Sequence, residues 1–426
     1  MNTFKNIAIR FITIFSLLFY FTNIKAQILT IDSILKIIEI NNPELQMYDA
    51  QIKALDAYAT GAYSFDPPRV GVGFFMTPYN PQMWTQDVMN NQQGMGNFMI
   101  SAEQMFTNPA KLKANSDYMS NMSGAEFEMK NFARYELFSM AKMSYYEWVI
   151  LKKKIRVINE SESLLNYLIK STELRYTYGM DKLNAYYKAK GMLGDIQLME
   201  IMIDQEISQK RNELNTLLNR SVNTLFEVDS TYSIESYEKI MIDTSIISNN
   251  RSDYKVISKN IEVLRSKQIF EYSKRLPDFG IKFDHMVPFG TDPQQFSLMA
   301  MVSIPIVPWS SKMYKSSVLG LNFEIDALKA QQQILLNEVS GNMQNLKIML
   351  QSKKQQLELY ENNIMPAMKK NYELSLLAYE QNTEELFMVL DAWQNYKLIQ
   401  LSYYDQLMEL LALQIEYEKQ LQLPLN

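Results

Sequence analysis

The chain of 426 residues carries an internal repeat, which constrains its fold more than any single residue does. The segment from Asn41 to Phe74 aligns without a gap on the segment from Asn250 to Phe283, about 209 residues later. A second region of similarity has an offset of about 203 residues. It aligns Tyr176 with Tyr379, Gly179 with Asn382, and Leu183 with Leu386. Each copy reads as a helix, a proline-marked break, short strands and then very long helix. Such repetition indicates a duplicated structural framework rather than an enzyme.

Residues 1–26 have the pattern of a secretory signal peptide. Lys5 and Arg10 make a basic start, and an apolar core of eleven residues runs from Phe11 to Phe21. We therefore expect export. The chain has no cysteine, which excludes disulfides and thiolate metal sites. Its formal net charge of −5 argues against a nucleic-acid partner, which would require a concentrated basic face.

Four segments alternate bulky apolar residues with small or polar ones, as strands do. They lie at about 69–76 and 96–106 in the first copy and at about 278–287 and 295–306 in the second. Strands of this length suit a tilted crossing of a bilayer, although a soluble sheet packed on a helix gives the same alternation. Four strands cannot close a membrane barrel alone, so a membrane location requires several chains to pool their strands.

Two very long helical segments, at about 111–220 and 312–422, fill most of the remaining chain. Apolar residues in each step by three or four positions, as in coiled coils. Segments of this length are expected to fold back as helical hairpins, with Gly179 and Asn382 at equivalent turns. The predicted organisation is a first repeat at 27–220, a connector without periodicity at 221–248, and a second repeat at 249–426.

A series of motifs, in order along nearly all of the mature chain, resembles the TolC-like outer membrane efflux protein family. The opening helix matches at Leu29-Thr30 through Asn42-Pro43-Glu44-Leu45. The entry to the third strand and the exit from the fourth match at Leu276-Pro277-Asp278-Phe279 and at Ile304-Pro305-Ile306-Val307-Pro308-Trp309. The best match is Ile364-Met365-Pro366-Ala367, followed by Ala378-Tyr379 and by Val389-Leu390-Asp391-Ala392.

The resemblance implies a mainly α fold with a small membrane β part, assembled as a homotrimer. Four strands from each chain would form one twelve-stranded outer-membrane barrel, continuous with a hollow tunnel of periplasmic helices. In the family, the hairpin tips dock a periplasmic adaptor and open to receive cargo from an inner-membrane pump. Tyr178, Gly179 and Met180 match the first tip motif. Asn382 and Thr383 mark the second, where Asn382 replaces the usual glycine; asparagine tolerates a left-handed backbone, so the turn can survive.

Methionine is the compositional outlier, with 28 residues in the chain. Six of them fall within 30 residues in the first strand pair and its loop: Met76, Met83, Met89, Met95, Met99 and Met105. Thioethers are soft ligands that select Cu(I), and by the same softness Ag(I), over hard cations. Methionine also packs adaptably, so lipid-facing or gap-filling bulk is the alternative. Because several TolC-like proteins serve copper, silver or other heavy-metal pumps, transient metal contact by these residues is the functional hypothesis.

Four carboxylates near the expected hairpin tips are candidates for the channel entrance: Asp181, Glu384, Glu385 and Asp391. A trimer would repeat each of them around its axis, and rings of carboxylates favour cations. An ordinary solvated helix face explains the same residues. His285, the only histidine, lies in a strand-like run and cannot build a typical zinc site alone. We expect no cofactor and no catalytic residue.

These observations predict the outer-membrane exit duct of a tripartite efflux system, passively conducting cargo such as copper or silver cations. A drug duct or a type I secretion duct of the same family would share these features. A non-conducting periplasmic coiled-coil scaffold or adhesin would share the signal peptide and the heptads, but would not need four amphipathic strands. The expected partners are further copies of the chain, outer-membrane lipid, a periplasmic adaptor and an inner-membrane pump.

Overall fold

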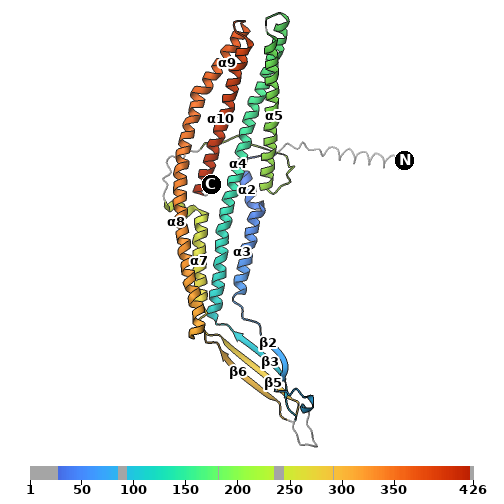
Figure 1. Ribbon diagram of the computed structural model, residues 1–426, viewed down its shortest axis with the longest axis vertical. Coiled ribbons are helices and arrows are strands. Elements are labelled where there is room, and N and C mark those ends of the chain that lie inside the picture. The colour runs from blue at the N-terminus through green and yellow to red at the C-terminus, as the bar shows by residue number, and fades with distance from the viewer. Residues whose placement is uncertain (1–26, 85–93, 181, 235–243, 291, 423–426) are drawn as a thin grey trace, which may run out of the picture. The chain divides into compact units, whose positions relative to one another are not determined.

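The computed structural model describes residues 27–84, 94–180, 182–234, 244–290 and 292–422. The expected signal peptide, 1–26, lies outside them. The described chain is mainly helical and divides into two compact units (Figure 1). The hairpin unit takes its residues from Met1–Gln46, Ala133–Ile246 and Val339–Asn426, and the sheet unit takes its residues from Met47–Phe132 and Ile247–Glu338. Within the described ranges, no helix combines the length and the apolar character that crossing a membrane requires.

The sheet unit contains a four-stranded antiparallel sheet in the order β2–β3–β5–β6 (Figure 1). The strands are β2 (Arg69–Phe75), β3 (Asn97–Phe106), β5 (Phe279–Pro288) and β6 (Gln295–Val302). The last strand is shorter than the predicted 295–306. Pro305 has no N–H to donate to a ladder, and the chain turns there into the next helix.

Three α-helices of the described chain begin with proline. Helix α3 (Pro43–Gly61), helix α4 (Pro109–Thr177) and helix α8 (Pro308–Leu359) each have proline as their first residue. Proline is favoured there because its fixed φ suits a helix and its missing N–H would have no intrahelical partner. Two of these starts are also capped by asparagine: Oδ1 of Asn42 accepts from N of Glu44 at 2.9 Å, and Oδ1 of Asn108 accepts from N of Ala110 at 3.0 Å.

Helix α7 (Ser252–Ser273) also belongs to the sheet unit. Ile257 and Ile261 of α7 pack with Ile325 of α8 in a buried cluster. At the other end of this unit's helices, the Asp278 carboxylate, which precedes β5, accepts from N of Asn108 at 2.9 Å and from Nζ of Lys111 at 2.7 Å. The start of α4 is thus fastened to the start of β5.

The hairpin unit is built from two long helix pairs. Helix α4 pairs with α5 (Leu183–Leu217), while α8 continues through a π-helical turn at Tyr360–Ile364 into α9 (Met365–Glu380), which pairs with α10 (Leu386–Leu421). One buried cluster joins α4, α5, α9 and α10, including Leu165, Ile196 and Val389, each fully buried. Ile196 and Ile203 lie in the predicted apolar stripe, so the stripe faces this core.

The expected connector at 221–248 contains short elements that the sequence did not indicate. Strand β4 (Phe226–Val228) pairs in parallel with β1 (Gln27–Leu29), and α6 (Thr244–Asn250) begins within the same range. Phe226 is buried, and its ring centre lies 5.1 Å from that of Trp148. Strands of three residues are too short to show a period-two alternation, which explains why the pattern missed them.

Helix α2 (Ile31–Asn41) precedes α3 and is the opening helix of the described chain. Thr30 caps it, because Oγ1 of Thr30 accepts from N of Ser33 at 3.4 Å.

Candidate functional site

The two expected hairpin turns have the same backbone geometry. Gly179 follows α4 with a φ of +72°, and Asn382 follows α9 with a φ of +60°. In each turn, this left-handed residue donates its N–H to the carbonyl three residues back, and the next residue donates five residues back. The pairs are Gly179 with Tyr176, Met180 with Arg175, Asn382 with Tyr379, and Thr383 with Ala378. This is the Schellman motif of helix ends, and it confirms that Asn382 takes the conformation for which glycine is usual.

Arg175, in the last turn of α4, links the two hairpins of one chain. Its guanidinium carbon lies 4.4 Å from the ring centre of Tyr379, which is only 2% exposed, and its Nη2 donates to Oδ1 of Asn382. A second link joins Nζ of Lys182 to Oε1 of Glu385 at 2.8 Å, but both side chains are more than half exposed. Exposed ion pairs contribute little, so the contact of Arg175 with the buried ring is the stronger link.

The predicted tip residues are accessible. Tyr178 is 78% exposed and Met180 is 63% exposed, which leaves an aromatic ring and a thioether in solvent beside the first turn. Thr383 is exposed as well, and its Oγ1 donates to the carbonyl of Ala378 at 2.9 Å.

The candidate carboxylates have different surroundings. Glu385 takes part in the ion pair with Lys182, Glu384 is half-buried, and Asp391 is exposed and accepts from Nδ2 of Asn395 at 3.3 Å. Asp181 lies outside the described residues. Among the residues that the structure describes, no three His, Asp or Glu side chains gather as metal ligands. Whether these carboxylates line a channel entrance stays a prediction.

One face of the four-stranded sheet is apolar and exposed. The strand register places Val72 of β2, Ile100 of β3, His285 of β5 and Phe296 of β6 in one cross-strand row of this face. Its exposed apolar residues are Val70, Val72, Phe74, Ile100, Phe106, Phe279, Ile281, Phe283, Phe296, Leu298 and Val302. His285 is thus a strand residue within this face. An apolar surface of this extent needs a covering partner or an apolar medium.

The opposite face of the same sheet is polar, with methionine added. One cross-strand row on this face holds Arg69, Glu103, Lys282 and Met299, and the next holds Gly71, Ser101, Asp284 and Ser297. Asp284 is only 6% exposed, and its Oδ1 lies 3.0 Å from Nζ of Lys282.

The structure divides the six candidate methionines. Met99 and Met105 lie on the polar face of the sheet, where Met286, Met299 and Met301 from the second copy join them. Met76, Met83 and Met95 lie in the loop between β2 and β3, at 78%, 46% and 52% exposure. Met89 lies outside the described residues. The three methionines of the second copy were missed because only the first-copy cluster stood out by density; the period-two alternation of β5 and β6 already placed them on the same face.

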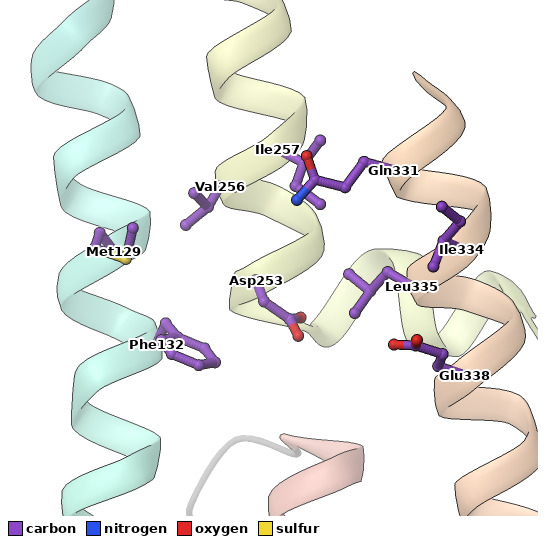
Figure 2. Close-up of a pocket in the computed structure, with 9 residues that line it drawn as sticks. All are labelled: Met129, Phe132, Asp253, Val256, Ile257, Gln331, Ile334, Leu335 and Glu338. Atoms are coloured by element: carbon purple, nitrogen blue, oxygen red, sulfur yellow. The ribbon is translucent and has the colours of Figure 1, made fainter. Parts of the chain in front are cut away.

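A cavity of about 330 Å³ lies between α4, α7 and α8 in the sheet unit (Figure 2). Its walls are mostly apolar, with Met129 and Phe132 on α4 and Leu335 on α8. The carboxylate of Asp253 at its edge is engaged by Arg251, at 2.6 Å from Nη2 to Oδ2. Such a lining suits packing or an apolar ligand rather than acid–base chemistry.

A buried lysine occupies the core side of α10. Lys397 is 6% exposed, and its Nζ lies 5.1 Å from the ring centre of Trp393. Burial lowers the pKa of this amine, and the charge of Asp195 partly opposes that effect. By contrast, Lys210 lies 2.7 Å from Glu147 and 3.0 Å from Glu213, and hydrogen bonds to these carboxylates raise its pKa although burial opposes them.

Comparisons with known proteins identify the fold. No family model matches the sequence, and no curated protein matches it. Solved structures match nearly the whole chain. CusC, described in a study of transmembrane channel formation, gives a TM-score of 0.73 at 13% identity over 92% of this chain and 91% of its own. VceC, an outer membrane protein of Vibrio cholerae, gives 0.69 at 14% identity, over 92% and 96%. The outer membrane channel CmeC of Campylobacter jejuni gives 0.71 at 12% identity, over 92% and 85%.

The chain has the TolC-like channel fold. Sequence patterns predicted the positions of both turns and the alternation that gives the sheet its two faces. They did not find Arg175 as the link between hairpins. The repeat contains a signal for it: position 175 aligns with Ala378, so a long cation stands in one copy where the other has a methyl group. The long side chain of Arg175 extends from the first hairpin to Tyr379 and Asn382 of the second.

Proposed function

We propose that three copies of this chain form the outer-membrane exit duct of a tripartite efflux system. Their sheets would close a twelve-stranded barrel in the outer membrane, and their helices would form a periplasmic tunnel. The duct catalyses no reaction and passively conducts cargo that a periplasmic adaptor and an inner-membrane pump deliver.

The open, four-stranded sheet carries this proposal. Its apolar face is exposed, with Val72 at 70%, Phe296 at 71% and Leu298 at 67%, whereas the opposite face is polar. Within the described residues, β2 and β6 each have one unpaired edge. Strands in a bilayer cannot leave backbone groups unpaired, so further copies must complete the sheet. A barrel with an apolar exterior and a polar interior is the arrangement that meets both conditions.

The two Schellman turns support an entrance that opens. The Arg175–Tyr379 and Arg175–Asn382 contacts hold the two hairpin turns of one chain together. Breaking them would let the two turns move apart at the ends of the hairpins. The exposed Tyr178 and Met180 give an adaptor an apolar contact beside the first turn, and we assign Gly179, Asn382 and Thr383 to the same docking region.

Single-channel recording from the purified, detergent-extracted trimer in a planar bilayer tests the duct. We expect low conductance from the native protein. Arg175→Ala should raise the conductance or the open time, because it removes the contacts with Tyr379 and Asn382, the stronger of the two links between the turns. Lys170→Ala, an exposed change on the same helix α4, is the matched control and should leave the recordings unchanged.

A folded trimer that conducts in neither the native form nor the Arg175→Ala form would contradict the duct. That result, together with a stable monomer in detergent, would favour the periplasmic scaffold. An increase in conductance with Lys170→Ala equal to that with Arg175→Ala would contradict the role given to the turns.

For cargo, we propose soft heavy-metal cations such as copper and silver. The support is the exposure of the loop methionines Met76, Met83 and Met95, because thioethers prefer soft cations. Silver, copper and drug sensitivity of a deletion strain tests this assignment, with the native gene returned on a plasmid as the control. Sensitivity to drugs alone would support a drug duct instead.

A further inference from the structure

Two methionines from different strands converge over a glycine on the polar face of the sheet. Gly280 of β5 has Met105 of β3 and Met301 of β6 as its direct neighbours across the sheet. A Cβ at position 280 would overlap Sδ of Met105 and would lie 3.2 Å from Cε of Met301. The missing side chain therefore lets both methionines extend over β5 toward one another. Both are half-buried, so their thioethers lie against the sheet rather than free in solvent.

A second pair lies further along the same face. Met99 of β3 stands directly opposite Met286 of β5, and both are half-buried. Residues opposite one another have Cβ atoms roughly 4.5–5.5 Å apart, so the two flexible thioethers can reach one ion. Six positions separate Met99 from Met105 on β3, which at about 3.4 Å per residue places the pairs roughly 20 Å apart. Met299, 50% exposed, lies two residues from Met301 on the same face.

The charged side chains between the two methionine pairs cancel one another, so they do not attract cations to this face. Arg69 and Lys282 contribute two positive charges, and Glu103 and Asp284 contribute two negative ones. The buried carboxylate of Asp284 is engaged by Lys282 at 3.0 Å. Selection on this face therefore falls to the thioethers, which discriminate by softness rather than by charge.

We propose that Met105–Met301 and Met99–Met286 form two stations that bind soft monovalent cations, Cu(I) or Ag(I), in succession. This inference rests on the proposed duct, because only a pore built from several sheets places the polar face along the path of cargo. Each station offers two neutral ligands from one chain, which makes binding weak. Weak and repeated sites suit conduction, because an ion must leave each site as readily as it enters.

Methionine-methyl NMR of the full-length trimer, labelled with [methyl-13C]methionine and titrated with silver nitrate in chloride-free buffer, tests the stations. Single Met→Leu changes at positions 99, 105, 286 and 301 assign the four signals and nearly preserve side-chain volume. We expect these four signals to shift at lower Ag(I) concentration than those of Met313 and Met349, which are exposed on α8.

Two variants separate the stations. Met105→Leu should weaken Ag(I) binding at the first station by roughly tenfold or more, read from the remaining signal of Met301, because even changes outside the ligands cost about tenfold at metal sites. Gly280→Ala should weaken the same station, because its methyl group displaces the thioether of Met105. Both should leave the shifts of Met99 and Met286 in place. The matched control, Met313→Leu with Met349→Leu, should change nothing at either station.

Conductance of potassium through the same trimers separates this inference from the proposed function. Channels that conduct while the four sulfur positions respond no more strongly than Met313 would overturn the stations and leave the duct standing. Selective Ag(I) shifts in trimers that never conduct would overturn the duct and leave the cation sites standing.

Discussion

At the residue scale, the lysines that pack against the helix core differ in whether a carboxylate lies beside the amine. Lys142 is 2.6 Å from Glu418 and Lys419 is 2.8 Å from Glu136, so these amines have carboxylate partners. Lys397 contacts the face of Trp393 and is more deeply buried. Burying a charge without a close opposite charge costs stability. Removing one partner of a buried ion pair also costs stability, because the other partner then remains as an uncompensated buried charge.

Lys397→Met should therefore raise the stability of the protein at pH 7, by roughly 1–2 kcal/mol. Folding lowers the pKa of this amine from its ordinary 10.5, so the native chain becomes more stable as the pH rises from the lowered pKa toward 10.5. The advantage of the methionine variant should shrink over that interval. Thermal unfolding followed by circular dichroism at a series of pH values measures both effects.

Lys142→Met is the matched control for that comparison, and it should lower stability because it leaves Glu418 without its amine. A loss of stability at pH 7 with Lys397→Met would contradict the assignment and indicate a favourable partner for this amine.

At the element scale, the junctions between helices and strands carry the specific polar contacts. Asp278 holds the start of α4 through Asn108 and Lys111, and its own N–H donates to Oγ of Ser303 at 2.9 Å, just beyond β6. A carboxylate at a helix start also interacts favourably with the helix dipole. Three elements therefore depend on one aspartate, which the sequence had shown only as part of a Leu-Pro-Asp-Phe motif.

Asp278→Ala should destabilise this junction by about 1–3 kcal/mol, because Lys111 and the N–H of Asn108 lose their acceptor. Hydrogen exchange should report the change as faster exchange at the start of α4 and at the entry to β5, with the hairpin turns unaffected. Asp326→Ala, which removes an exposed partner of Lys329 on α8, should leave exchange unchanged. Equal effects of the two substitutions would contradict the role of Asp278.

At the scale of the whole molecule, the two faces of the sheet decide how copies can assemble. The apolar face suits lipid, the polar face suits an aqueous pore, and the open edges of β2 and β6 call for neighbouring copies. The helices add a second requirement, because in the proposed duct the links at Arg175 must break for the entrance to open.

Adjacent residues on β6 test the orientation of the faces. Leu298→Lys places a charge on the apolar face and should cost about 2–4 kcal/mol if that face lies near the middle of a bilayer. We expect most of the protein to be lost from the outer-membrane fraction and from the trimer band on mild gels. Ser297→Lys, one residue earlier on the polar face, should preserve both. If both variants assembled equally well, the apolar face would not be the lipid face.

The sequence by itself determined the positions of the two turns and the alternation of the strands, because these depend on local chemistry. Gly179 and Asn382 accept a left-handed backbone, and period two assigns each strand residue to a face. Strands β1 and β4 were not predicted, and the reason is also local: three residues are too few to show the alternation.

Only the tertiary structure decided which residues meet across the repeat. The register of β3, β5 and β6 placed Met105 and Met301 over Gly280, and the packing of the hairpins placed Arg175 against Tyr379. Met105 lies 175 positions from Gly280, and Arg175 lies 204 positions from Tyr379. No pattern within one segment specifies a partner that far away. The repeat that indicated a duplicated framework is completed by contacts between its copies, such as that of Arg175, which stands where the second copy has Ala378.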